Sequence, residues 1–300
     1  MIDLHTYPLF IGAVALLVAA RGHGMAYGLT FPRARLYAAA PLALAALACT
    51  PAQAQDAGSL ARLLAAPQRT PANVARDGFR HPLQVLEFFG VRPDSTVVEI
   101  LPGSGGYYME ILAPYLKDKG LYIAADRDAL APPPYLADQH QLLARLKAEP
   151  ARYGRVVVTE FNADLHEIAP PGSADFVLSF RNLHNWIARN EAAASLRAFR
   201  KALKPGGVLG VVDHRGRGDL PQEAQTKSGY VREDYAIALI ERAGFRLVGA
   251  SEVNANPRDT KDYPQGVWTL PPTYRMKEQD RAKYAAIGES DRFTLKFVKQ

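Results

Sequence analysis

An apolar run that ends in a glycine-rich turn constrains the fold more than any other feature of this 300-residue sequence. Residues 97–101 read VVEIL, and residues 102–106 read PGSGG. The run is typical of a buried strand, and the apolar spacing of 107–116 predicts a helix directly after the turn. A strand, a glycine turn and a helix in this order are typical of a nucleotide site in an open α/β sheet, where ligands bind outside the carboxyl ends of the strands.

The spacing of the glycines narrows the nucleotides that this turn could bind. A dinucleotide fingerprint needs G-x-G-x-x-G, but Tyr108 stands where the third glycine should follow Gly105. A P-loop needs Gly-Lys-Ser or Gly-Lys-Thr, which the sequence lacks. The acid Glu99 followed by G-x-G instead resembles the first motif of class I S-adenosylmethionine-dependent methyltransferases. The sequence departs from that motif at Leu101, where many members of the class have a glycine.

The rest of the chain alternates between apolar strand patterns and helix patterns. Further strands are predicted at 121–126, 155–161, 174–180, 208–212, 245–250 and 292–298. Helices are predicted at 83–89, 135–148, 191–203 and 233–243. The succession predicts an α/β fold with a doubly wound sheet of seven strands, mostly parallel with an antiparallel last strand. We expect strands four and five to flank the first strand opposite strands two and three, and the alternating last strand to be less buried.

Polar residues at the ends of the second and third predicted strands extend the candidate nucleotide site. Asp126 ends the second strand, 20 residues after Gly106. In a neighbouring parallel strand its carboxylate would face the glycine turn and accept from both ribose hydroxyls; the alternative is a helix-capping role. Asn162 and Asp164 follow the third strand, and either could accept from an adenine amino group. The expected cofactor contacts are Glu99, Gly103, Gly105, Gly106, Asp126, Asn162 and Asp164.

The order of these elements extends the methyltransferase resemblance over residues 80–300. More narrowly, several stretches resemble a bacterial family of predicted methyltransferases whose members often carry signal peptides. These stretches are residues 98–106, 180–186, 212–215, 267–272 and 294–299. The resemblance implies S-adenosylmethionine as the cofactor and methyl transfer to a small-molecule acceptor, which neither the sequence nor the family defines.

Candidate catalytic residues follow the fourth and fifth predicted strands. The methyl group of S-adenosylmethionine is already activated, so the protein mainly has to align an acceptor and remove a proton. His184, His214 and Asp213 are the candidates, because a histidine has a suitable pKa for this task. We favour His184, because Asn182 beside it could orient an acceptor and Trp186 could shield it from water. The alternative is that both histidines are hydrogen-bonded structural residues.

The first 54 residues differ from the rest and predict export. Residues 31–35 are basic, residues 38–48 are apolar, and residues 52–54 read AQA, as in a secretory signal peptide with Gln55 as the mature start. Met25 is then the expected true start. The predicted organisation is an extension and signal peptide over 1–54, a helical segment over 55–80 and a class I methyltransferase domain over 81–300. We expect a periplasmic protein; the alternative is an uncleaved N-terminal membrane anchor.

Composition narrows the partners and the chemistry. A net charge of +6, scattered along the chain, is too mild to indicate nucleic-acid binding. Cys49, the sole cysteine, lies before the predicted cleavage site, so no disulfide or thiolate chemistry is expected. The candidate histidines come without a tight helical pair or a second cluster, so no metal is expected either. An exported ligand-binding protein without catalysis is the main alternative, and a nicotinamide-dependent oxidoreductase is disfavoured by Tyr108.

Overall fold

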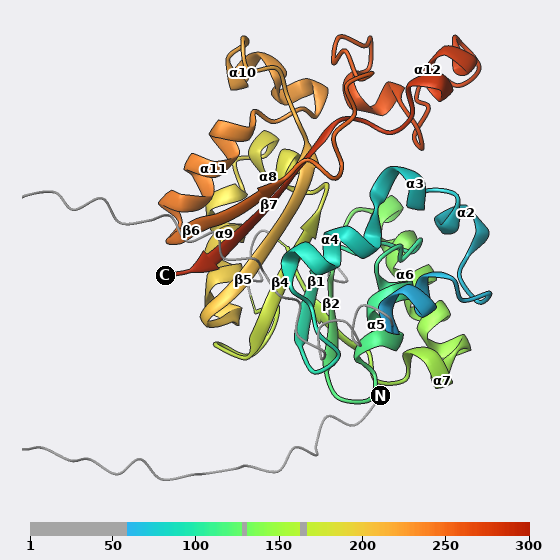
Figure 1. Cartoon of the computed structure of the whole chain (residues 1–300), viewed down its shortest axis with the longest axis vertical. Helices are drawn as coiled ribbons and strands as arrows, with labels where there is room; N and C mark the ends of the chain where they lie inside the picture. Colours follow the sequence, from blue (N-terminus) through green and yellow to red (C-terminus); the bar gives the residue numbers. More distant parts are fainter. Residues whose placement is uncertain (1–58, 128–130, 163–166) are drawn as a thin grey trace, which may run out of the picture. The chain divides into compact units, whose positions relative to one another are not determined.

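The computed structural model describes residues 59–127, 131–162 and 167–300. Their centre is a seven-stranded sheet in the order β3-β2-β1-β4-β5-β7-β6 (Figure 1). The strands are β1 (Thr96–Ile100), β2 (Leu121–Asp126), β3 (Val157–Glu160), β4 (Ala174–Phe180), β5 (Leu203–His214), β6 (Phe245–Ser251) and β7 (Arg292–Lys299). The pairs from β3 through β5 are parallel, and β7 runs antiparallel to both β5 and β6. The predicted doubly wound α/β fold and its antiparallel last strand are confirmed, with β4 and β5 on the opposite side of β1 from β2 and β3.

Two predictions about strands five and seven were wrong. β7 lies inside the sheet between β5 and β6, and residues 292–295 are fully buried. Its alternating pattern does not mark an edge position, because Phe293, Leu295 and Phe297 lie in the core on one face while Lys296 on the other face donates to the Phe88 carbonyl. β5 begins at Leu203, not at 208. The Lys-Pro-Gly-Gly stretch belongs to the strand, and the register between β5 and β4 shifts there.

Helices cover both faces of the sheet, and each face has its own apolar core. One face carries α4 (Pro82–Phe89), α5 (Met109–Leu116), α6 (Pro133–Ala148) and α7 (Pro150–Tyr153). The other face carries α8 (Leu183–Ala188), α9 (Ala192–Ala202) and α11 (Glu233–Arg242). Leu86 and Leu112 represent the first core, and Leu196 and Ile240 the second. The short helix α4 follows its sequence signals closely, since it begins at a proline and ends at Gly90, whose φ of 88° only glycine adopts easily.

Two further segments reach the carboxyl edge of the sheet. The first is N-terminal and contains helical residues 59–64, α2 (Pro71–Val74) and α3 (Asp77–Arg80). The second is the connection from β6 to β7, with η2 (Gly266–Thr269) and α12 (Arg281–Ile287). It packs against η1 (Thr226–Ser228), which follows α10 (Gln222–Gln225). A Cβ on Gly266 would lie 2.2 Å from the Ser228 carbonyl oxygen, so this close approach requires glycine.

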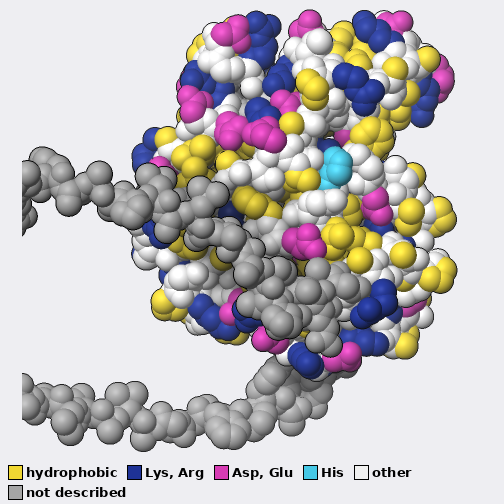
Figure 2. Space-filling model, viewed as in Figure 1, with side chains coloured by type: hydrophobic (Ala, Val, Ile, Leu, Met, Phe, Trp, Pro, Cys, Tyr) yellow, Lys and Arg dark blue, Asp and Glu magenta, His cyan; other side chains and the backbone are white. Residues whose placement is uncertain are grey.

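Surface features of the described residues are ordinary. On the face shown in Figure 2, Lys and Arg side chains are interspersed with Asp and Glu around the segments that carry α10 and α12. No helix within the described ranges is long and apolar enough to cross a membrane. The predicted signal peptide, Met25 and the mature start at Gln55 lie outside the described residues.

Candidate active site

The glycine turn after β1 has the backbone that its sequence predicts. Gly103 and Gly106 have φ of 67° and 48°, in the left-handed region that glycine enters without steric cost. Leu101 has a φ of 52°, so leucine adopts a conformation that favours glycine, at a cost of about 1–2 kcal/mol. The Leu101 amide donates to the Ala125 carbonyl at 2.8 Å, which fastens the turn to the end of β2. A Cβ on Gly105 would meet no atom within 4 Å, so the turn faces open space there.

Side chains from α2 and α6 hold this turn in place. The Asn73 amide donates to the Gly105 carbonyl at 2.8 Å, and Arg145 Nη1 donates to the same oxygen at 3.1 Å. The Ser104 amide donates to Asp138 Oδ1 at 3.1 Å. The N-terminal helical segment is therefore part of the structure that shapes the turn, although no motif in the sequence indicated it.

In the predicted cofactor site, Asp126 has a buried carboxylate oxygen without a hydrogen-bond donor among the described residues. It ends β2, is only 3% exposed, and its Oδ2 has no hydrogen-bond partner among the described residues. Burial raises the pKa of this carboxyl, because the charged form loses its hydration. A buried acceptor without a donor costs about 1–3 kcal/mol, and more when it is charged. The two hydroxyls of a ribose would supply the missing donors, so the residue fits the nucleoside part of S-adenosylmethionine.

Glu99 lies inside the sheet near its carboxyl edge, and its carboxylate is already bonded. Tyr122 donates its hydroxyl to Glu99 Oε2 at 2.6 Å. Burial raises the pKa of Glu99 to about 7, with Asp126 adding to the rise while the Tyr122 hydroxyl and Arg80 oppose it. Glu99 thus stands next to the candidate cofactor site, and its direct contact with a cofactor stays a prediction.

The adenine end of the candidate site is described only in part. β3 is followed by Phe161, whose amide donates to the Asp126 carbonyl at 2.7 Å. Asn162 comes directly after it, and this bond brings the loop to the end of β2. Asp164 lies outside the described residues. The choice between Asn162 and Asp164 as the adenine partner therefore stays open.

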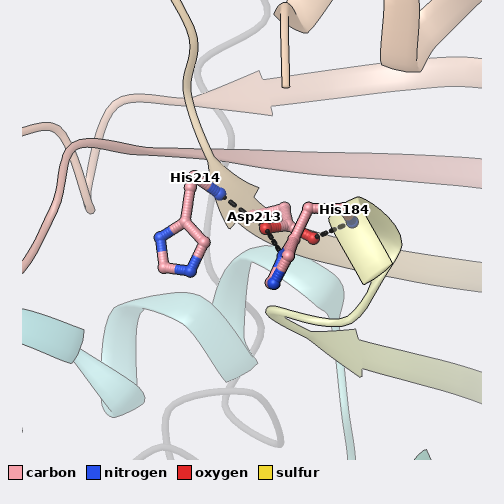
Figure 3. A group of neighbouring side chains, drawn as sticks. All are labelled: His184, Asp213 and His214. Carbon is pink, nitrogen blue, oxygen red and sulfur yellow. Dashed lines mark hydrogen bonds and ion pairs between the residues drawn. The ribbon is translucent and has the colours of Figure 1, made fainter. Parts of the chain in front are cut away.

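The three predicted catalytic residues lie together at the carboxyl ends of β4 and β5 (Figure 3). His184 belongs to α8, which follows β4, and Asp213 and His214 end β5. Asp213 Oδ1 lies 2.9 Å from His184 Nδ1 and accepts the His214 amide at 2.7 Å. Asp213 Oδ2 accepts the His184 amide at 3.1 Å. The carboxylate is fully buried and holds His184 through one hydrogen bond to the imidazole and one to the backbone amide.

The carboxylate of Asp213 also sets the proton on His184. An ionised carboxylate only accepts hydrogen bonds, so His184 Nδ1 donates and Nε2 is left to take a proton. Burial alone would raise the pKa of Asp213, but the charge and the hydrogen bond of His184 outweigh it and the pKa is lowered. Asp213 is therefore ionised at neutral pH. A histidine oriented by a buried carboxylate is a common arrangement for a general base.

His214 differs from His184 in both its partner and its charge. Its Nδ1 lies 2.6 Å from the Ser290 hydroxyl oxygen. Burial lowers its pKa well below the usual value, and His184 and Arg181 lower it further despite Asp213. His214 is neutral at physiological pH, and among the described residues its ring forms no hydrogen bond to a carboxylate. The geometry favours His184 as the base.

Other residues expected near His184 take different places. Trp186 packs in the core, with its ring 5.3 Å from that of Phe199, so it does not shield His184. Trp268, from the connection between β6 and β7, lies beside His184 instead, with ring centroids 6.0 Å apart. The side-chain amide of Asn182 donates to the Ile100 carbonyl at 3.0 Å and joins the end of β4 to β1. The connection between β6 and β7 therefore contributes an aromatic wall beside His184.

The same three side chains could also hold a metal ion. One nitrogen or oxygen from each of His184, Asp213 and His214 lies within 4.8 Å of the others, the one such group found in the described ranges. Asp213 already accepts hydrogen bonds at both oxygens. Coordination by the same atoms would replace the bond between Asp213 and His184 Nδ1, so a metal site and a hydrogen-bonded base are alternatives.

Solved structures share this architecture at low sequence identity. A SAM-dependent methyltransferase from Aquifex aeolicus matches 82% of this chain and 99% of its own, with 17% identity and a TM-score of 0.52. The chain has the class I methyltransferase fold. The [4+2]-cyclase SpnF matches 83% of this chain and 95% of its own, with 18% identity and a TM-score of 0.52. Since a cyclase is among the neighbours, the fold alone does not decide the reaction. No protein-family model matches the sequence, and no curated protein matches it.

Proposed function

We propose that this protein transfers a methyl group from S-adenosylmethionine to a small-molecule acceptor. The observation that carries the proposal is the buried Oδ2 of Asp126 at the end of β2, which has no hydrogen-bond partner in the described part of the chain. It lies beside a glycine turn whose first residue, Leu101, donates its backbone amide to the Ala125 carbonyl. An acceptor oxygen and an open glycine turn at neighbouring strand ends are the two features that a nucleoside needs.

The residues of this chain have distinct tasks in the proposed reaction. Gly103, Gly105 and Asp126 bind the cofactor, which supplies an activated methyl group when bound. His184 Nε2 removes the proton from a hydroxyl or amine of the acceptor. Asp213 keeps Nε2 free and stabilises the imidazolium that forms, as a buried carboxylate does in other histidine bases.

Non-catalytic ligand binding in an exported protein is the alternative function. It would need the glycine turn and Asp126 but has no use for an oriented base. The bond between Asp213 Oδ1 and His184 Nδ1, at 2.9 Å in a fully buried position, favours the enzyme. Methyl transfer from labelled S-adenosylmethionine to any component of a host metabolite extract would identify the acceptor, and a protein that binds the cofactor but never transfers the label would support the alternative.

Binding of S-adenosylhomocysteine tests the cofactor site without an acceptor. Replacing Asp126 by Ala should weaken binding by about 1.5–3 kcal/mol, the usual loss for hydrogen bonds to a charged group. Isothermal calorimetry on the full chain measures this loss, with NAD as a ligand that should not bind. Asp118→Ala is the matched control, because Asp118 is exposed after α5 at the opposite edge of the sheet. Equal affinity of the folded Asp126→Ala variant and the wild type would remove the ribose assignment.

A further inference from the structure

Four arginines surround one buried glutamate near the carboxyl ends of β4, β5 and the start of β7. Arg76 Nε lies 2.6 Å from Glu289 Oε1, while Arg80 Nε and Arg292 Nη1 lie 3.4 and 2.9 Å from Oε2. Glu289 is 3% exposed. Burial would raise its pKa, but Arg292, Arg80, Arg76 and Arg181 outweigh that effect and lower it to about 2. Within the described residues, Glu289 is the one carboxylate that forms ion pairs with these arginines, so positive charge exceeds negative charge in the cluster.

Several guanidinium donors of this arginine cluster have no hydrogen-bond partner among the described residues. Arg76 Nη2, Arg80 Nη2 and Arg292 Nε are buried without a hydrogen-bond partner among the described residues. Arg181 is half-buried, and its guanidinium forms no hydrogen bond or ion pair within the same ranges. Burial and the charge of Arg80 lower the pKa of Arg181 well below its usual value. Buried, unpaired cations are costly, so a structure keeps them mainly where an anion binds.

Three of the four arginines line a small cavity. Its walls are Arg80, Tyr108, Phe180, Arg181, Val212, Asn254 and Arg292. The rings of Tyr108 and Phe180 stack with their centroids 3.7 Å apart and form an apolar wall. The cavity measures about 10 Å³, room for one water-sized group. A single oxygen of a carboxylate or phosphate fits that space between guanidinium donors.

The cavity lies beside the proposed base. Phe180 ends β4, and Val212 immediately precedes the Asp213 and His214 pair on β5. The charges of Arg181 and Arg292 contribute to the lowered pKa of His214, which places them within electrostatic range of that pair. The His214 ring lies 5.1 Å from the His184 ring, so the cavity and the proposed base lie at the same edge of the sheet.

We propose that Arg80, Arg181 and Arg292 bind an anionic group, a carboxylate or a phosphate, of the methyl acceptor. The proposal rests on the proposed methyl transfer and names the class of its substrate: a small anion whose hydroxyl or amine reaches His184 Nε2. Guanidinium groups suit both anions, because each can donate two parallel hydrogen bonds to them.

The carboxylate of S-adenosylmethionine is a second source of the same chemistry. Two observations favour the acceptor. The methionyl end of the cofactor carries an ammonium group with its carboxylate, so it offers no net negative charge to a cluster with an excess of positive charge. The strand residues that line the cavity, Phe180 and Val212, belong to β4 and β5, whereas Asp126, the expected ribose contact, ends β2.

Phosphate binding to the full chain tests the site directly. The probe is inorganic phosphate, titrated by calorimetry at constant ionic strength with S-adenosylhomocysteine present. The wild type should bind phosphate saturably, and Arg181→Gln should weaken that binding about 10- to 100-fold, as expected for lost bonds to a charged group. Arg246→Gln is the matched control, because Arg246 is an exposed strand arginine on β6 and should bind as the wild type does.

Two further readouts separate a binding site from a purely structural cluster. Without phosphate, Arg181→Gln should melt no lower than the wild type, because it removes repulsion and breaks no bond. No saturable phosphate binding by the wild type, or undiminished binding by Arg181→Gln, would overturn the proposal. A lower melting temperature of Arg181→Gln without phosphate would likewise contradict an unpaired, repelled cation.

A second binding experiment tests whether the arginines bind the cofactor instead. It compares the affinity for S-adenosylhomocysteine with the affinity for 5′-methylthioadenosine, which lacks the amino-acid end. If Arg181→Gln leaves both affinities unchanged, the acceptor assignment is supported. A selective loss for S-adenosylhomocysteine would assign the arginines to the cofactor and overturn it. If the wild type does not bind S-adenosylhomocysteine, the proposed methyl transfer is wrong. The phosphate titration then still decides whether the arginines form an anion site.

Discussion

His184 and His214 have the same side chain but different chemistry because their partners differ. His184 faces a fully buried carboxylate at 2.9 Å, and His214 faces the hydroxyl of Ser290 at 2.6 Å. The sequence located both histidines after the right strands, since position in the chain fixes which strand end a residue follows. It could not separate them, because Ser290 comes from a segment 76 residues later in the chain than His214.

Loss of the proposed base should affect turnover and leave the cofactor in place. His184→Gln should lower the rate of single-turnover methyl transfer by about 10²–10⁴, the usual contribution of a general base. The affinity for S-adenosylhomocysteine should stay the same, because His184 is expected to contact the acceptor only. His214→Gln is the paired control and should retain most of the rate. Similar rates in both folded variants and the wild type would mean that His184 is not the base.

Elements with strong local signals were predicted correctly, and elements defined by distant partners were not. The helix α4 has proline at its start and glycine after its end, so its bounds follow from local chemistry. β7 has no local signal for its place between β5 and β6, because strand order depends on pairing over long sequence separations. The same holds for α3, which reaches the connection before β7 through Arg80 and Glu289.

The link between α3 and β7 should depend on pH through Glu289. Its pKa falls from 4.5 to about 2 in the folded protein. A lowered carboxyl pKa contributes stability that is present above pH 4.5 and is lost as the pH falls through 2. Glu289→Gln should therefore lower the free energy of unfolding by about 3 kcal/mol at pH 7, which is 2.5 pKa units at 1.36 kcal/mol each. The difference from the wild type should shrink as the pH falls toward 2.

Urea unfolding of both proteins at several pH values measures this dependence. Glu278→Gln is the control, since the Glu278 side chain is 87% exposed and pairs with Arg281 only at 3.6 Å. Exposed pairs of this kind contribute about 0–1 kcal/mol. A loss that is the same at pH 7 and at pH 3 would show that Glu289 acts through packing and not through its charge.

At the scale of the whole molecule, the sequence predicted the sheet and the strand-end residues but not what closes over them. Glu99, Asp126, His184 and Asp213 follow from strand ends, which meet at one edge of any parallel sheet. Asn73, from the N-terminal segment, donates a hydrogen bond to the Gly105 carbonyl, and no sequence motif predicts this contact. Such contacts join segments without regular periodicity, and only the folded chain brings them together.

Export is the property of the whole chain that the described residues leave open to test. A basic segment, an apolar run and AQA at 52–54 stand in the order that signal peptidase recognises. We expect N-terminal sequencing of protein from the native host to begin at Gln55. Ala54→Leu should block cleavage, because the peptidase needs a small residue there, whereas Ala38→Leu should leave it unchanged. Protein recovered from the cytoplasm with residues 31–54 still attached would exclude the signal peptide, and membrane-bound protein of that length would favour the uncleaved anchor.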